Sequence, residues 1–183
     1  MPRHIGYHYT PSKNLDSIFK GVSCWFSSRE YTGTKILKGL RPENRQHGFT
    51  PFDIYEEPLS CTYNSPSWVQ EEYVFCFLEP EPKTWKENKE FPNIWKELME
   101  YLSRNGSISL LSFGIMKSDD AHIIDRAWLE RFNTYPYEEY NTLWQQFLRS
   151  RVPVSKYKSD YSLPELIISK TVSPNRLRVE KRL

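Results

Sequence analysis

The stretch GYHYTPSKNLDSIFKG, residues 6–21, contains the first regular elements of this 183-residue chain. Together with the two residues before it, its first part alternates as a strand does, with His8 between Tyr7 and Tyr9. Ser12 is expected to cap a helix that ends near Gly21. The apolar face of that helix is formed by Leu15, Ile18 and Phe19. The stretch therefore predicts a strand followed by a helix, with a histidine on the strand.

Four further segments favour strands. The run YVFCFL, residues 73–78, is rich in aromatic and β-branched side chains, as central strands are. SISLLSFGIM (107–116) and AHIID (121–125) favour two more, and residues 163–183 predict a strand, a turn at Ser173-Pro174 and a final strand. Because strands and helices do not alternate regularly, the sequence predicts an α+β fold. The length and even composition predict one domain over residues 1–183.

Two longer helices are expected. One follows Pro92 and ends at Asn105-Gly106, and the other spans about Tyr137 to Arg149. Both have an aromatic stripe that we expect to lie in the core, formed by Ile94, Trp95, Leu98, Tyr101 and Leu102 in the first and by Tyr140, Leu143, Trp144, Phe147 and Leu148 in the second. Residues 25–57 are expected to be mostly loop with one helical turn near Lys35 to Lys38, and the charged residues 79–91 an exposed connection.

Composition and cysteine spacing limit the partners and sites that can be expected. The net charge of +2 is too small to predict nucleic-acid binding from electrostatics alone. Three cysteines without metal-ligand spacing predict neither a disulfide framework nor a zinc site, and no histidine or aspartate spacing predicts any other metal. No signal-like apolar start and no run of membrane-spanning length is visible, so we expect no membrane partner and a cytoplasmic protein, in its own or a target cell.

Three polar residues lie within or beside otherwise apolar strands and could act in catalysis. They are His8 in YHYT, Tyr63 in CTYNSPSW and Glu165 in LPELIIS. Burying an unpaired carboxylate beside leucine and isoleucine is costly. Glu165 is therefore expected at the mouth of its strand or facing a cleft.

The order and setting of these three pieces resemble the ADP-ribosyltransferase superfamily, on the branch with a His–Tyr–Glu triad that includes diphtheria-type toxins and poly(ADP-ribose) polymerases. YHYT followed by an NL-x-x-I helix looks like the family's first strand and helix, and ILKGLRP, residues 36–42, is similar to the turn that often follows. YNSPSW resembles the tyrosine strand and the start of the next helix. PELII with VSPNRL resembles the strand with the catalytic glutamate and the return after it.

The resemblance implies a split antiparallel sheet and a reaction that transfers ADP-ribose from NAD to a macromolecular acceptor, protein or nucleic acid, with release of nicotinamide. Glu165 would stabilise the oxocarbenium-like transition state, His8 would bind the ribose hydroxyls, and Tyr63 would stack on nicotinamide. The remaining NAD contacts would come from the Tyr9 backbone, Thr10, Ser65 and, for the phosphates, an arginine among Arg29, Arg41 and Arg45. A toxin or effector of this size could also have an antitoxin or immunity partner.

The chain departs from the family pattern in two places. Tyr9 replaces the glycine that many members have after the histidine, and Leu163 occupies the position where arginine-modifying toxins have a second acidic residue. Modification of arginine is therefore disfavoured. Tyr55, Tyr73 or the CWFSS segment (24–28) could take the place of Tyr63. Three other functions stay open: an inactive binding module with the same fold, a 2′-phosphotransferase relative, and an RNA-binding domain with exposed aromatic residues.

Overall fold

The computed structural model describes residues 4–27, 32–42, 65–104 and 106–183, without the side chains of 22–27, 32–37 and 70. Among these residues it contains nine strands: β1 (Ile5–Pro11), β2 (Val22–Ser27), β3 (Thr32–Leu37), β4 (Val74–Cys76), β5 (Ile108–Gly114), β6 (Ala121–Asp125), β7 (Val152–Pro153), β8 (Pro164–Ile168) and β9 (Arg178–Arg182). Its α-helices are α1 (Leu15–Lys20), α2 (Lys83–Lys86), α3 (Ile94–Ser103), α4 (Ala127–Glu130) and α5 (Tyr140–Ser150).

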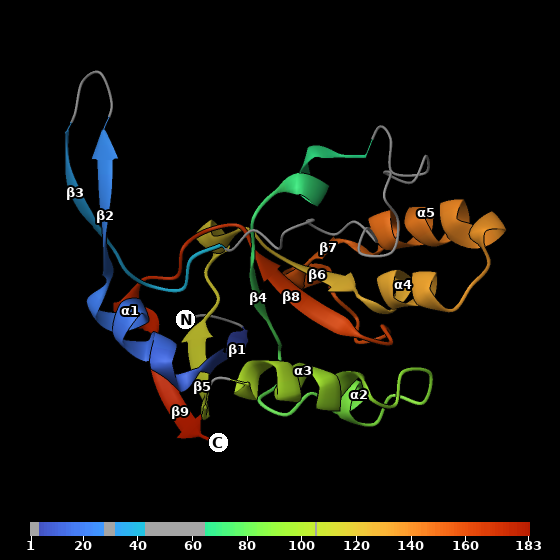
Figure 1. Ribbon diagram of the computed structural model, residues 1–183. Coiled ribbons are helices and arrows are strands. Elements are labelled where there is room, and N and C mark those ends of the chain that lie inside the picture. Colours follow the sequence, from blue (N-terminus) through green and yellow to red (C-terminus); the bar gives the residue numbers. More distant parts are fainter. Residues whose placement is uncertain (1–3, 28–31, 43–64, 105) are drawn as a thin grey trace.

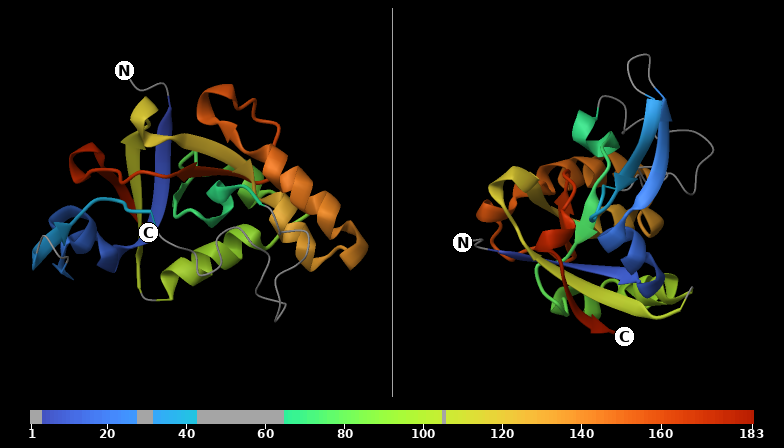
Figure 2. Two further views of the ribbon diagram at one scale, coloured as in Figure 1. Left: turned by 90° about the horizontal axis from the view of Figure 1, so that it is seen from above. Right: turned by 90° about the vertical axis from the view of Figure 1, so that its left-hand side faces the viewer.

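The strands form two sheets and a hairpin. One sheet has the order β1-β5-β9 and the other β4-β8-β6-β7, while β2 pairs with β3. Every pair is antiparallel. Helices and antiparallel sheets are present together, so the predicted α+β class is confirmed. Figures 1 and 2 show α1 and the hairpin at one end of the molecule and α4 and α5 at the other.

The two sheets meet at a single residue pair among those described. Tyr7 of β1 and Phe77, which directly follows β4, form an antiparallel bridge with two backbone hydrogen bonds of 2.8 Å each. Continued along the strands, this register would pair Tyr9 with Phe75, but within the described part of the chain the two strands share no further bridge. A sheet that would otherwise be continuous is therefore split between β1 and β4.

Three apolar clusters hold the layers together. The first lies where both sheets meet α1 and includes Phe113 and Leu166. The second packs α4 and α5 against β6 and β8 and contains the fully buried Trp144 and Phe147. The third packs α2 and α3 against β1 and β5, with Trp85 at its centre. Helices thus cover the split sheet near the junction, as Figure 1 shows for α2 and α3 below the strands.

The predicted N-terminal strand and helix are confirmed, but the predicted N-cap is wrong. A short 3-10 helix spans Ser12–Asn14, and α1 begins after it with Asn14 at the N-cap position. The Ser12 hydroxyl instead shares a 2.7 Å hydrogen bond with Ser109 of β5. A hydroxyl that is already bonded to a neighbouring strand is not available to cap the helix.

The segment with the ILKGLRP motif connects the hairpin to the main body. Gly39 has a φ of 97°, its N–H donates to the Ile18 carbonyl at 2.7 Å, and Leu40 forms a bridge with Val172. A Cβ atom at Gly39 would lie 2.4 Å from the Val172 carbonyl oxygen. Both the backbone conformation and the close approach therefore require glycine here.

Two loop predictions are wrong in part. Residues 25–57 were expected to be mostly loop with a helical turn near Lys35, and of these 28–31 and 43–57 lie outside the described residues. In the described part β2 and β3 form a six-residue-pair hairpin in which Lys35 pairs with Cys24, so no helical turn forms there. Threonine, isoleucine and aromatic residues in this segment favour extended backbone over a helical turn. The connection 79–91 is mostly exposed, as predicted, but it contains α2, whose Trp85 is 4% exposed. One buried aromatic side chain fixes this single turn by tertiary packing, which local sequence does not reveal.

The helix predictions are largely confirmed. The α5 stripe lies in the core, with Tyr140, Leu143, Trp144 and Phe147 buried and Leu148 packed against them. In α3 the stripe contacts the third cluster, but Tyr101 was wrongly assigned to the core, since it is 63% exposed. Its ring lies near the end of the helix, where Arg104 stacks over it at 5.4 Å. The predicted C-terminal strand, turn and strand are confirmed as β8, a 3-10 turn at Pro174–Arg176 and β9.

Candidate functional site

The split between β1 and β4 positions His8. The His8 side chain reaches the carbonyl oxygen of Phe75 on β4, with a distance of 2.8 Å from Nδ1. A carbonyl oxygen only accepts hydrogen bonds, so Nδ1 donates the proton. In the neutral ring Nε2 is then the acceptor. The imidazole makes the bond that the Tyr9 N–H would make if β1 and β4 continued as a ladder.

The backbone of Tyr9 points into the same split. Alternate residues of a strand direct their N–H and C=O groups to the same side, and those of Tyr7 bond to Phe77. The N–H and C=O of Tyr9 therefore point toward β4. Within the described ranges, no residue bonds to either group, although Tyr9 is only 6% exposed. A buried donor and acceptor side by side on a strand edge form a site for one amide group.

The Tyr9 side chain lies away from this edge. Its hydroxyl donates to the Pro80 carbonyl, and its ring makes edge contacts with Phe77 at 6.1 Å and Trp95 at 5.4 Å between ring centroids. Burial and the neighbouring charge of Glu81 raise the pKa of Tyr9. The bulk of tyrosine, where many family members have glycine, is therefore packed against α3.

Glu165 lies at the start of β8, on the other side of β4. It pairs with Ile124 of β6, and continuing the β4–β8 register by one pair places it opposite Phe77. Across β4, Glu165 therefore has the same register position as Tyr7 of the bridge that joins the sheets. It lies two strands from β1, and its register position differs by one residue from that of His8. Its side chain is buried, with the residue 3% exposed. The topology brings the strands of His8 and Glu165 to opposite sides of β4.

Arg126 is the cation beside Glu165. Its guanidinium lies 3.8 Å from the Glu165 carboxylate, while its Nε donates to Glu130 at 2.7 Å. The Arg126 backbone N–H donates to the Leu163 carbonyl at 2.9 Å, which fixes α4 to the start of β8. A guanidinium this close offsets part of the cost of burying a carboxylate. Sequence reasoning missed this residue, whose only signal is its position directly after a predicted strand.

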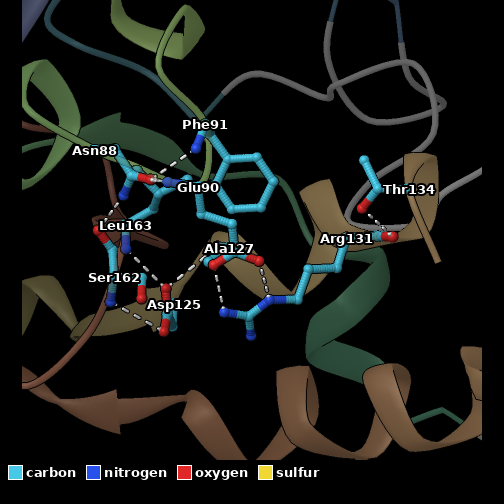
Figure 3. Close-up of polar contacts among 9 residues, drawn as sticks. All are labelled: Asn88, Glu90, Phe91, Asp125, Ala127, Arg131, Thr134, Ser162 and Leu163. Carbon is cyan, nitrogen blue, oxygen red and sulfur yellow. Dashed lines mark hydrogen bonds and ion pairs between the residues drawn. The ribbon is translucent and has the colours of Figure 1, made fainter.

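A polar network holds the segment that leads into β8 (Figure 3). The Asp125 carboxylate, 5% exposed, accepts from the backbone N–H groups of Ala127, Ser162 and Leu163 at 2.9–3.2 Å. It therefore ties the end of β6 and the start of α4 to the residues just before Glu165.

Asn88 and Arg131 extend the network to the connection between α2 and α3. The Asn88 amide donates to Ser162 at 3.0 Å and accepts from the N–H of Phe91 at 2.8 Å. Arg131 makes two 2.7 Å hydrogen bonds to Glu90 and stacks over Trp128. These contacts join three chain segments around the amino end of β8, as Figure 3 shows. These contacts fix the position of the segment that leads into β8, and therefore the position of Glu165.

The other predicted NAD-binding residues are spread more widely. Thr10 is 4% exposed, and its hydroxyl accepts from Asn14 at 3.3 Å. Ser65 lies against α5, where its hydroxyl accepts from the Trp144 indole at 3.1 Å. Arg41 is exposed and follows the Leu40–Val172 bridge, beyond the carboxyl end of β8, whereas Glu165 lies at the amino end. The structure does not bring these three together with Glu165.

The tyrosine of the predicted triad lies outside the described residues, as do Tyr55, Arg29 and Arg45, and the side chains of CWFSS are outside them too. The remaining alternative, Tyr73, directly precedes β4. It is 1% exposed, and its hydroxyl donates to the Trp68 carbonyl at 2.9 Å. Burial and the adjacent Glu71 raise the pKa of Tyr73. A ring buried in this way has no face for stacking on nicotinamide.

No helix among the described residues is long and apolar enough to span a membrane. Comparison of the chain with protein-family models, with curated proteins and with solved structures gave no match.

Proposed function

We propose that the chain is an NAD-dependent ADP-ribosyltransferase of the His–Tyr–Glu type, with the nicotinamide end of NAD bound in the split between β1 and β4. The observation that carries the proposal is the open edge at Tyr9 beside His8. The backbone N–H and C=O of Tyr9 point toward β4, and no described residue bonds to them. The nicotinamide carboxamide has one carbonyl and one NH₂ group, so it matches this donor and acceptor.

The ribose would be held next to that edge. With Nδ1 donating to Phe75, a ribose hydroxyl would donate to Nε2 of the neutral His8 ring when NAD is bound. This contact would fix the anomeric carbon relative to the strand, which is a positioning role. The bond to Phe75 supports this assignment because it sets the tautomer of His8 and orients the ring.

Glu165 would act on the reacting carbon. Cleavage of the glycosidic bond sends the electron pair to the nicotinamide nitrogen, which becomes neutral, and leaves an oxocarbenium-like ribose. A buried carboxylate stabilises that positive charge more strongly than a hydrated one. The acceptor, or water, then attacks the carbon, and its proton passes to Glu165. A macromolecular acceptor, protein or nucleic acid, and a role as toxin or effector belong to the same proposal.

Nicotinamide release from NAD tests the proposal. The wild-type chain is expected to release nicotinamide, and Glu165→Gln, which keeps the size and removes the charge, to lower the rate by roughly a hundredfold or more. Glu180→Gln is the matched control, because it makes the same change on β9 and is expected to leave the rate unchanged. Thermal unfolding of each variant checks that the fold is retained.

Calorimetric titration with NAD separates the remaining outcomes. Binding of NAD without release by the wild type would support the inactive binding module in place of the enzyme. If NAD does not bind at all, the proposal is wrong. If release occurs and persists in Glu165→Gln, the site assignment is wrong.

A further inference from the structure

A concave site lies at the opposite end of β1 from the open edge of Tyr9. It has a volume of about 1190 Å³ and is lined by the start of β1, the end of β5, the start of β6 and the segments before and within β9. Neither His8, Tyr9, Phe75 nor Glu165 lines it. This groove is larger than the 300–1,000 Å³ that small ligands usually occupy. Its size is suited to a segment of a polymer.

More cations than anions line the groove, although Asp119 balances the charge of one of them, Arg176. Lys117, Arg176 and Arg178 line it, together with the carboxylate of Asp120. Arg176 is held rigidly, since its guanidinium donates to both Asp119 oxygens, at 2.8 and 2.6 Å, and to the Gly114 carbonyl at 2.6 Å. Lys117 and Arg178 are exposed, and among the described residues neither forms an ion pair. Two cations are therefore available to an anionic ligand.

The charge distribution along the chain supports the same conclusion. Residues 149–183 contain nine lysines and arginines and three acidic residues, whereas residues 1–148 contain sixteen and twenty. The last part of the chain is thus net +6, although the whole is only +2. Arg176 and Arg178 of the groove belong to this basic stretch of the sequence. Such an asymmetry favours a polyanionic partner.

The other groups that line the groove favour nucleic acid over an acidic peptide as the polyanionic partner. His4 has a flat ring at the groove, and flat rings stack on nucleobases. The His122 ring also lines the groove, but its side chain is only 13% exposed and contacts Asp120 and Arg151. Apolar surface lies beside them, including Met116, which is 51% exposed, and Ile5, which is 48% exposed. A groove of about 1190 Å³ is too small to enclose a double helix, whose bases are stacked inside, but it has room for unpaired nucleotides.

We propose that this groove binds single-stranded nucleic acid, with Lys117 and Arg178 on the phosphates and the His4 ring beside a base. The proposal is independent of the proposed reaction, since it uses other residues and predicts binding without NAD. An acidic peptide is the alternative that the test must exclude.

Fluorescence anisotropy with a labelled oligothymidylate and a labelled oligouridylate tests the proposal, with an oligoglutamate peptide for comparison. Either oligonucleotide is expected to bind at low salt, more tightly than oligoglutamate, with affinity falling as salt rises. The double variant Lys117→Glu/Arg178→Glu is expected to weaken binding at least tenfold. Loss of two phosphate contacts also makes the slope of log affinity against log salt shallower by about 1.4.

The matched control is Lys83→Glu/Lys89→Glu, which makes the same charge change at two exposed lysines outside the groove. It is expected to change affinity by less than twofold. Met116→Glu tests the same groove by a single substitution at an exposed position and is expected to weaken binding as well. Equal losses in the control and the groove variants, oligoglutamate binding as tightly as the oligonucleotides, or no oligonucleotide binding at low salt would each overturn the proposal.

Discussion

The His8 imidazole and the Phe75 carbonyl are joined across the point where β1 and β4 separate, by a 2.8 Å hydrogen bond from Nδ1. This bond occupies the β4 carbonyl that Tyr9 would otherwise use, so a side chain keeps the backbone edge of β1 open. The structural and the proposed catalytic roles of His8 thus use different ring nitrogens, and substitutions can separate them.

Substitution of His8 by asparagine is expected to separate these roles. The amide NH₂ of the introduced asparagine can replace the Nδ1 donor, but the shorter side chain has no acceptor at the position of Nε2. The free energy of unfolding of His8→Asn should therefore lie within about 1 kcal/mol of the wild-type value, while NAD binding is lost. His8→Ala should lose both the bond and the binding. Urea unfolding and calorimetric titration with NAD measure the two effects. Wild-type NAD affinity in His8→Asn would contradict the role assigned to Nε2.

Gly39→Ala is expected to destabilise the fold by about 2–4 kcal/mol, because a Cβ would meet the Val172 carbonyl at 2.4 Å in a backbone that already has a positive φ. Gly106→Ala is the control. Its φ is 111°, but no atom of the described residues lies within 4 Å of the added Cβ. The free energy of unfolding of Gly106→Ala should fall by only about 1 kcal/mol, because only the positive φ opposes alanine there. Equal losses in urea unfolding would show that the close approach to Val172 is unimportant.

Asn88→Ala tests the polar network at the amino end of β8. The Asn88 side chain makes four hydrogen bonds, to Thr84, Ser162, Glu90 and Phe91. At about 0.5–1.5 kcal/mol each, with two of them exposed, their loss should lower the free energy of unfolding by about 2–4 kcal/mol. Asn141→Ala, at an exposed position of α5, should change it by less than about 0.5 kcal/mol. If the two variants unfold alike, the network does not stabilise this segment.

The Asp119–Arg176 pair predicts a loss of stability in acid. Burial by itself would raise the pKa of Asp119, but the hydrogen bonds from Arg176 and the Met116 N–H outweigh it and lower this pKa below its ordinary value of 3.8. A carboxyl group with a lowered pKa stabilises the fold above its unfolded pKa. That contribution is lost as the pH falls from about 3.8 through the folded value.

Urea unfolding at a series of pH values measures this effect. Asp119→Asn should be less stable than the wild type at neutral pH and should lose less stability on acidification. Asp16→Asn, which removes an exposed carboxylate paired with Lys20, should follow the wild-type curve. An Asp119→Asn curve parallel to that of the wild type would mean that this pair does not contribute to acid sensitivity.

The sequence predicted the strands that carry His8 and Glu165 because each has a strong local pattern. It missed the β2–β3 hairpin, where glycine and lysine obscure a short alternation, and α2, whose single turn depends on one buried tryptophan. Within the site, Arg126 and the Asp125 network were missed for a different reason. Asp125 meets Ser162 and Arg131 meets Glu90 across 37 and 41 residues, and such contacts leave no periodic signal along the chain.

The strand pairing also determines the order in which the molecule can fold. β1 pairs with β5 about a hundred residues later, and β4 pairs with β8 over a similar distance. Neither sheet can therefore form from neighbouring segments, and loop closure must precede most of the native contacts, so folding is expected to be slow for a chain of this size. During synthesis, His8 leaves the ribosome before Glu165, and the strands of the two residues cannot take their places on opposite sides of β4 until residue 168 has emerged.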